Sequence, residues 1–301
     1  MILVDFSQIA ISTLNAEMGR QLSAFDESNV PLLKYMVLNS LRQYNVKFRK
    51  EYGKMVICCD SRSWRKDVFP HYKGIRHADR EESSTNWKLI FGALDELKDG
   101  LREFFPYPIV ATQGAEADDI IGVLAAHGER EVDDNALFST AGGVLILSGD
   151  NDFLQLQRYP GVVQFSPLFK KFLKPEVSWE KTLREHIVQG DKGDGVPNMR
   201  SPDDIFMIRG RQSSITKDYL DRWSTLPEET LFINATESEK RNFKRNKQLV
   251  DLSATPSEIK DEILHEYVQA SYKAVANGRR HIMKYLIDKK LAGLVKNLED
   301  F

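Results

Sequence analysis

The strongest constraint on the fold is a set of four short apolar segments, rich in Val and Ile, that end in or run into acidic residues. These segments are Ile2–Asp5, Met55–Asp60, Pro108–Thr112 and Val144–Ser148. None of them alternates apolar with polar residues, as a strand with one solvent-facing side does. The pattern therefore predicts buried strands of a parallel sheet.

Helical patterns separate these segments. Apolar residues recur at three- and four-residue steps over Leu32–Phe48 and Trp87–Leu101, and a third helix is expected over Ala117–His127. Glu129–Asn135 is interpreted as a solvated loop. Strands that alternate with helices predict an α/β fold, in which a central, mostly parallel sheet is flanked by helices and joined by right-handed crossovers.

The second half of the chain is organised differently. Val162–Ser166 and Lys170–Lys174 are expected to form a hairpin beyond the main sheet, and the pattern is mostly helical from Ser178 onward. We therefore predict an α/β domain over residues 1–180 and a helical region over residues 181–301.

Composition narrows the class of protein. The chain has 301 residues, of which 42% are apolar, so it can build a core, and the C-terminal pattern from Ile282 to Leu298 is expected to close that core. No stretch approaches the roughly 18 apolar residues of a membrane span, and Met1–Asp5 has no basic leader, so we expect a soluble, cytoplasmic monomer. Cys58 and Cys59 are neighbours in an apolar run and are expected to be buried thiols. The net charge is only −2, so a nucleic-acid partner has to be argued from the distribution of charge.

Acidic side chains follow all four predicted strands, at the edge where an open parallel sheet binds its ligands. They are Asp5, Asp60, Glu116, Asp118, Asp119, Asp150 and Asp152. A single residue of this kind is usually a helix cap or a turn residue, but acids at four neighbouring strand ends converge. Converging carboxylates repel one another or take up protons, and a bound cation resolves that conflict.

The donors at these positions are all oxygen atoms, without His or Cys, which favours Mg²⁺, with Mn²⁺ as a substitute, over zinc. Two such ions about 3.5–4 Å apart suit a phosphate-centred reaction. Asp191 and Asp194 lie in a glycine-rich stretch, Gly190–Pro197, which by its own pattern is an ordinary surface turn. The histidines, His127 and His186 among them, show no ligand spacing and are interpreted as structural or exposed.

A basic run follows Asp60. Residues 61–80 hold six Lys or Arg against two Asp. A solvated face explains such a run equally well, but beside a predicted metal site it can hold phosphates. The candidate nucleic-acid contacts here are Arg62, Arg65, Lys66, Tyr72 and Arg80. For Tyr72, packing is the alternative to contact with unstacked bases.

Further candidate contacts lie downstream. They are Lys192, Lys240, Arg241, Lys244 and Arg245. The strip formed by the last four is explained either by contact with a duplex or by the soluble face of a helix.

Four motifs together carry a resemblance to a known family. Leu3–Ser7, Glu116–Asp119, Ser148–Phe153 and Gly190–Asp194 resemble, in order and spacing, the acidic motifs of the flap endonuclease and 5′-nuclease family, and the resemblance to its bacteriophage ribonuclease H branch covers nearly the whole chain. The resemblance implies a PIN-like 5′-nuclease core with a basic arch at about residues 61–86, followed by a helix-turn-helix-type element that binds duplex phosphates. In a phage-encoded chain the location would be the host cytoplasm.

The resemblance also implies an activity and partners. The expected activity is removal of RNA primers or flaps from DNA and RNA–DNA hybrids with 5′ ends. The partners it suggests are a single-stranded DNA-binding protein and a sliding clamp. The segment after Pro197 departs from the family's usual second glycine-rich turn, which puts a monovalent-ion site there in doubt.

Site residues follow from the same resemblance. It implies a first metal cluster made by Asp5, Asp60, Glu116 and either Asp118 or Asp119. It implies a second cluster made, directly or through water, by Asp150, Asp152, Asp191 and Asp194. Lys73 and Arg76 resemble the Lys and Arg that contact the scissile phosphate, where they would offset developing negative charge.

Two rival functions remain open on the sequence. A metal-dependent phosphohydrolase of small phosphoesters would share the carboxylates but would not need the basic strips. A non-catalytic DNA-binding module would explain the basic strips but gives no reason for acids at four strand ends.

Overall fold

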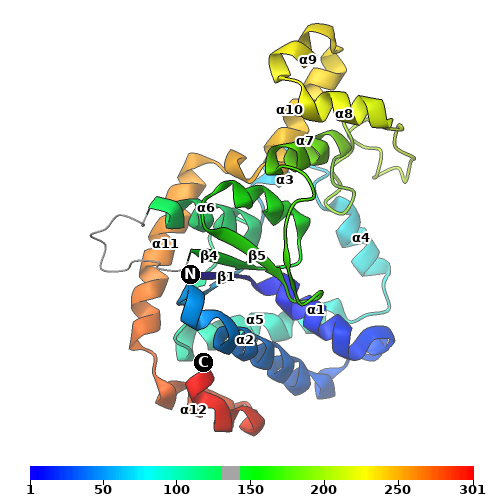
Figure 1. The fold of residues 1–301 in the computed structure, drawn as a ribbon. Helices are drawn as coiled ribbons and strands as arrows, with labels where there is room; N and C mark the ends of the chain where they lie inside the picture. Colours follow the sequence, from blue (N-terminus) through cyan, green and yellow to red (C-terminus); the bar gives the residue numbers. More distant parts are fainter. Residues whose placement is uncertain (131–142) are drawn as a thin grey trace.

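The computed structural model describes residues 1–130 and 143–301, and its centre is a six-stranded sheet in the order β3-β2-β1-β4-β5-β6 (Figure 1). The strands are β1 Ile2–Asp5, β2 Met55–Cys58, β3 Ile109–Val110, β4 Val144–Leu147, β5 Val162–Ser166 and β6 Lys171–Leu173. All neighbouring strands pair in parallel except β5 and β6. The predicted α/β fold with a mostly parallel sheet is confirmed.

The predicted position of the hairpin is wrong in one respect. β5 and β6 do form a hairpin, but β5 also pairs in parallel with β4, with Val162 opposite Val144 and Phe165 opposite Leu147. The hairpin therefore extends the main sheet. Most side chains of β5 are buried, as they are in the other parallel strands. As a result, the C-terminal end of β5 lies at the same edge as the ends of β1 and β4.

The helices predicted over Leu32–Phe48, Trp87–Leu101 and Ala117–His127 correspond to α2, α5 and α6. The α-helices are α1 Phe6–Met18, α2 Val30–Tyr52, α3 Arg65–Val68, α4 Gly74–Glu82, α5 Trp87–Phe104, α6 Ala117–Arg130, α7 Trp179–Gln189, α8 Lys217–Thr225, α9 Glu228–Asn234, α10 Glu237–Val250, α11 Ser257–Ala276 and α12 Arg279–Asp288. The 3₁₀ helices are η1 Gly19–Ala24, η2 Glu27–Asn29, η3 Asn151–Arg158, η4 Leu252–Ala254 and η5 Ala292–Asp300. The predicted loop Glu129–Asn135 is wrong at its start, because Glu129 and Arg130 belong to α6, and its remaining residues lie outside the described residues.

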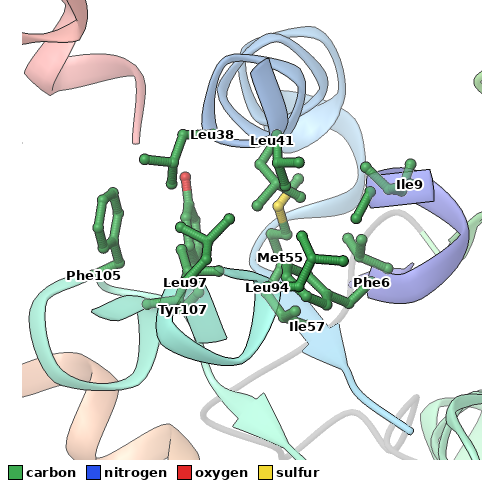
Figure 2. Close-up of a cluster of buried hydrophobic side chains, with 14 of the residues drawn as sticks. Phe6, Ile9, Leu38, Leu41, Met55, Ile57, Leu94, Leu97, Phe105 and Tyr107 are labelled. Carbon is green, nitrogen blue, oxygen red and sulfur yellow. The ribbon is translucent and has the colours of Figure 1, made fainter. Parts of the chain in front are cut away.

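Apolar side chains cover both faces of the sheet. On one face α1, α2 and α5 pack over the strands; Figure 2 shows Leu38 and Leu41 of α2 above Leu94 and Leu97 of α5, close to Ile57. The other face packs against α6 and α11. The predicted closure of the core by the C-terminal helices is confirmed, because α12 and η5 contribute buried side chains to the first face.

The two cysteines test the predicted strand geometry. Cys58 and Cys59 are both buried, free thiols. Cys58 belongs to the apolar cluster under α6, and Cys59 belongs to the cluster under α2 and α5. Neighbouring residues thus point to opposite faces of the sheet, as an extended chain requires.

The helical region after residue 180 has two parts. α7, α8, α9 and α10 share a small core around Trp223 and Phe243 and project from one end of the molecule in Figure 1. α11 instead returns along the sheet, where Glu266 accepts hydrogen bonds from the Ala111 N–H at 3.2 Å and from Thr112 Oγ1 at 2.7 Å. The predicted boundary at residue 180 therefore falls inside α7, and the last helices complete the α/β layers.

α7 and α8 are the packed pair of helices around the predicted duplex-binding turn. The connection between them, residues 190–216, is long and contains turns instead of a second helix immediately after the turn. Among the described residues, no helix combines the length and the apolar character that crossing a bilayer requires.

Candidate metal centre and nucleic-acid interface

The carboxyl edge of the sheet places acidic side chains beside the first turns of two helices. Asp5 ends β1 and caps α1, because its Oδ1 accepts the Gln8 N–H at 3.0 Å, while its Oδ2 accepts from Ser148 Oγ at 3.2 Å. Asp60 follows β2, and its Oδ1 accepts the N–H of Ala117, the first residue of α6, at 2.9 Å. The positive ends of both helix dipoles therefore lie beside these carboxylates.

Asp5, Asp60, Asp118 and Asp150 form what we call the first cluster. Burial, together with the charges of Asp60 and Asp150, raises the pKa of Asp5 to about 7. Burial also raises the pKa of Asp118 well above its usual range, and the charges of Asp5, Asp150 and Asp60 add to this effect. Carboxylates that are buried together in this way hold protons unless a cation neutralises them. The donor set, oxygen throughout, fits a divalent cation.

Asp119, the alternative to Asp118, is turned away from the first cluster. Its fully buried carboxylate accepts hydrogen bonds from Arg65 Nη1 at 2.8 Å, from Thr255 Oγ1 at 2.8 Å and from the Glu116 N–H at 3.0 Å. Although burial acts to raise it, the Arg65 guanidinium holds the pKa of Asp119 below its ordinary value. Asp119 therefore holds Arg65 and the start of α6 in place, and Asp118 faces the other carboxylates.

Two predicted nucleic-acid contacts lie in the interior. Arg65 is only 2% exposed, pairs with Asp119 and, at 3.2 Å, with Glu116, and donates from Nε to the Leu249 carbonyl at 2.8 Å. The prediction for Arg65 is therefore wrong, because a guanidinium enclosed by protein partners cannot reach a phosphate. Tyr72 is buried as well, and its hydroxyl lies 2.7 Å from an oxygen of Asp194, so packing is the interpretation that the structure favours.

Glu116 lies between the metal-ligand candidates and the basic residues. Its Oε2 accepts from Ser63 Oγ at 2.9 Å and lies 2.9 Å from the Tyr72 hydroxyl, and its Oε1 pairs with Lys73. Its carboxylate is buried. Glu116 therefore positions Lys73 and Tyr72 in this structure, beside the first cluster.

The second cluster consists of Asp150, Asp152, Asp191 and Asp194, so Asp150 belongs to both clusters. Asp150 caps η3, because its Oδ1 accepts the Asp152 N–H at 3.1 Å, and Asp191 Oδ1 accepts the Asp194 N–H at 2.9 Å. Burial, with the charges of Asp150, Asp191 and Asp194, raises the pKa of Asp152 to about 7. The glycine-rich turn is thus folded against the sheet edge, and its two acids face the acids of η3.

Sequence reasoning missed one residue of this site, His186. Its Nδ1 lies 3.2 Å from Asp152 Oδ1, and its Nε2 lies 3.5 Å from Asp191 Oδ2. The available signal was its place in the last turn of α7, one turn before Gly190. Gly190 ends the helix with φ +67°, where a Cβ would lie 2.4 Å from the Val196 carbonyl oxygen, and so it turns the chain back toward the histidine.

The basic arch, residues 61–86, contains α3 and α4, and its predicted catalytic pair contacts Glu116 and the second cluster. Lys73 Nζ pairs with Glu116 and lies 3.5 Å from Asp194 Oδ2. Arg76 Nη2 lies 2.8 Å from Asp194 Oδ1. Both cations therefore stand beside the residues that are expected to hold metal.

The other predicted nucleic-acid contacts divide by exposure. Those with exposed or half-buried side chains are Arg62, Lys66, Arg80, Lys192, Lys240, Arg241 and Lys244. Arg245 differs, because its side chain is 9% exposed, pairs with Asp203 and donates to the Pro197 carbonyl at 2.9 Å. Arg245 therefore braces the glycine-rich turn against α10 and does not form part of the interface.

A mostly parallel sheet with two carboxylate clusters at its carboxyl edge, joined to a basic arch, defines a nuclease whose site is built for divalent cations. The chain belongs to the 5′–3′ exonuclease family: residues 1–183 match the N-terminal resolvase-like domain of 5′–3′ exonucleases, and residues 178–301 match the C-terminal domain of T4 RNase H. It is similar to ribonuclease H of Enterobacteria phage T4, at 32% identity over 308 aligned residues that cover 99% of this chain and 95% of that protein. The chain is thus a 5′-nuclease.

One further relative is similar to about half of this chain, and two solved structures share its fold. DNA polymerase I of Rhizobium leguminosarum is 28% identical over 172 residues, which cover 55% of this chain and 15% of that protein. The fold is similar to that of the T5 5′-exonuclease with bound zinc, with a TM-score of 0.59, 14% identity, and coverage of 90% of this chain and 99% of that one. It is also similar to the T5 flap endonuclease with DNA and metal ions, with a TM-score of 0.57, 18% identity, and coverage of 90% and 98%.

Proposed function

We propose that this nuclease hydrolyses phosphodiester bonds at the 5′ ends and flaps of DNA and of RNA–DNA hybrids, and that it uses Mg²⁺ to remove RNA primers and adjacent DNA during replication. The observation that carries the proposal is the sharing of Asp150 by two carboxylate clusters, with Lys73 and Arg76 at the same edge. The names of its relatives, ribonuclease H, 5′-exonuclease and flap endonuclease, support this substrate class.

The residues fit a pair of cations. The first cluster, which contains Asp118 and not Asp119, would hold one ion with Glu116 as the further ligand that the resemblance implies, and the second cluster would hold the other. Oxygen donors suit Mg²⁺, and Mn²⁺ would substitute for it. When bound, such ions activate water and stabilise the leaving oxygen.

The chain's own cations would act on the phosphate. Lys73 and Arg76 are held over the clusters by Asp194, so a phosphate that binds there meets two positive charges already in place. They would exchange carboxylate partners for the scissile phosphate and offset the negative charge that grows in the transition state. Tyr72 would not contact the substrate, because its side chain is buried, its hydroxyl is bonded to Glu116 and Asp194, and burial raises its pKa.

The remaining exposed basic residues would bind the backbone of the substrate. Arg62, Lys66 and Arg80 lie on the arch, and Lys192 lies in the glycine-rich turn. A further strip on α10, formed by Lys240, Arg241 and Lys244, would follow the duplex. Contacts with phosphates alone give affinity without sequence preference, which removal of primers requires. A single-stranded DNA-binding protein and a sliding clamp as partners, a monomeric state and a cytoplasmic location stay predictions.

One assay tests the proposal. End-labelled RNA–DNA hybrid, 5′-flap DNA and single-stranded DNA are incubated with the protein in Mg²⁺, Mn²⁺, Ca²⁺ or excess chelator. Cleavage of the hybrid and flap in Mg²⁺ or Mn²⁺, little cleavage in Ca²⁺ and none in chelator is the expected result, because Ca²⁺ coordinates more loosely. Full cleavage in chelator would refute it. Turnover of a small phosphoester, with nucleic acid left intact, would favour a phosphohydrolase instead.

A further inference from the structure

We infer that His186 is a nitrogen ligand of the cation in the second cluster, and that it makes this position bind divalent transition ions, such as Mn²⁺ or Zn²⁺, more tightly than Mg²⁺. The inference rests on the proposed function, because it concerns the identity of an ion at the same site. It changes the all-oxygen donor set that the sequence predicts into a mixed nitrogen and oxygen set at one of the two positions.

The first support is geometric. One donor atom from each of Asp152, His186 and Asp191 can be chosen so that all of these atoms lie within 4.8 Å of one another. Bonds of about 2.0–2.2 Å from a metal to nitrogen and oxygen place neighbouring ligand atoms about 3 Å apart. The distance of 3.2 Å between His186 Nδ1 and Asp152 Oδ1 matches such an edge of a coordination shell.

The second support is the position of the other ring nitrogen. His186 Nε2 lies 3.5 Å from Asp191 Oδ2, so each ring nitrogen faces a different carboxylate. Histidines that bind metals nearly always donate their second N–H to a carboxylate or a carbonyl, which fixes the ring and its tautomer. With Nδ1 toward the ion, Asp191 would accept from Nε2 and hold the ring, so His186 Nδ1 and Asp152 would bind the ion directly and Asp191 would bind it through water.

The third support is that an ion can reach the three side chains and that the backbone of His186 is fixed. The side chains of Asp152, His186 and Asp191 are 18%, 25% and 27% exposed, so an ion can reach them from solvent. The backbone of His186 is fixed, because its carbonyl accepts the N–H of Gly190 at 2.8 Å where α7 ends. The ring is therefore presented from a rigid helix end and not from a mobile loop.

Donor chemistry then sets the selectivity. Neutral imidazole adds a ligand without adding to the negative charge of the four carboxylates in the second cluster. Mg²⁺ prefers oxygen ligands and gives up its water reluctantly, whereas sites that contain nitrogen bind transition ions in the order in which affinity rises from Mn²⁺ toward Cu²⁺. The first cluster has oxygen donors only, so the two positions would differ in preference.

Spectroscopy of bound Mn²⁺ tests this directly, apart from any activity. Electron spin-echo envelope modulation of Mn²⁺ in the wild-type protein should show coupling to a nitrogen nucleus, and the coupling should disappear in His186→Gln. Calorimetry should show that His186→Gln weakens one Mn²⁺ site by at least about 10-fold, because loss of a residue that only supports a ligand already costs about 10–100-fold. Mg²⁺ affinity should change by less than about threefold.

Two further variants sharpen the test. His265→Gln makes the same chemical change at an exposed position on α11 and should retain the nitrogen coupling. His186→Asp keeps a ligand but replaces nitrogen by oxygen, so it should lose the coupling while keeping two Mn²⁺ sites. Circular dichroism checks that each variant is folded.

The failures are distinguishable. If the wild type binds two Mn²⁺ ions and cleaves flaps with them but shows no nitrogen coupling, His186 is only a counter-ion between two carboxylates and the inference is overturned, while the proposed function stands. The inference is equally overturned if the coupling survives in His186→Gln. If the wild type binds no Mn²⁺ and cleaves in excess chelator, both the inference and the proposed function fail.

Discussion

Lys73 and Asp194 are joined through both backbone and side chain. The Lys73 N–H donates to the Asp194 carbonyl oxygen at 2.7 Å, and Lys73 Nζ lies 3.5 Å from Asp194 Oδ2. Lys73 also has φ +55°, a left-handed conformation that costs a residue with a Cβ on the order of 1 kcal/mol. Because the glycine-rich turn stabilises this conformation, the basic arch and the second cluster are positioned together.

Replacement of Lys73 should therefore affect the chemical step. Lys73→Ala is expected to lower the single-turnover cleavage rate by about 10²–10³-fold, the effect of removing one preorganised group that stabilises transition-state charge. Substrate affinity should fall much less, because other basic residues still bind phosphates. Rapid-quench cleavage and gel-shift titration at one salt concentration measure the two quantities.

The matched control for Lys73 is Lys50→Ala. Lys50 is exposed in the last turn of α2, next to the start of β2 and so at the opposite edge of the sheet. This variant loses the same charge and should cleave at the wild-type rate. An unchanged rate in Lys73→Ala, with a large loss of affinity, would reduce Lys73 to an ordinary phosphate contact.

Asp150 is shared by both clusters, so its loss should stop catalysis without unfolding the protein. Asp150→Asn keeps an oxygen that can accept the Asp152 N–H and cap η3. Cleavage should fall by at least about 10²-fold, because both ions lose a ligand. Binding of flap DNA at matched salt should be equal or tighter, since one charge that repels phosphate is gone. A variant that binds and cuts like the wild type would remove Asp150 from the site.

The sheet and the acidic edge could be predicted because both are local in sequence. Each strand is a short apolar run, and the acids of the first cluster stand at or just beyond strand ends, where parallel topology brings them together. The choice between Asp118 and Asp119 could not be made in this way. Successive residues of a helix point in different directions, and the long-range contacts of Asp119 with Arg65 and Thr255, from other elements, turn it away from the other carboxylates.

The errors share one physical cause. Arg65 lies in a basic run typical of a surface, but Leu249 and Glu116, from segments distant in sequence, enclose it, and similar burial favours packing between the two alternatives for Tyr72. His186 shows no ligand spacing in the sequence, because Asp152 reaches it only across a tertiary contact between η3 and α7. Burial and proximity created by topology leave no local pattern to recognise.

The metal-free protein should become less stable as the pH rises. The pKa of Asp5 and that of Asp152 are raised from 3.8 to about 7, so between these values the folded chain binds more protons than the unfolded chain, and the free energy of unfolding falls with pH. The pKa of His186 is also raised, by Asp191 and Asp152 against the effect of burial, and its contribution has the same sign.

Urea unfolding in chelator at several values between about pH 5 and pH 8 measures this slope. The lower limit avoids the region in which Asp191, whose pKa is lowered to about 2 by His186 despite burial, loses its own stabilising charge. Saturating Mg²⁺ or Mn²⁺ should flatten the slope, because the ions replace the bound protons. Stability that increases with pH in chelator would contradict the assignment of Asp5 and Asp152 to crowded, repelling clusters.

Asp118 and Asp119 are neighbours with opposite effects on stability, which gives the sharpest test of the site. Asp119→Asn removes the buried carboxylate that pairs with Arg65 at 2.8 Å, and loss of one partner of a buried pair costs about 3–5 kcal/mol. Asp118→Asn removes a carboxylate whose pKa is raised by burial and by Asp5, so in chelator at about pH 8 it should unfold at an equal or higher urea concentration than wild type, yet lose cleavage. A large loss of stability for Asp118→Asn, with none for Asp119→Asn, would mean that the two roles are exchanged.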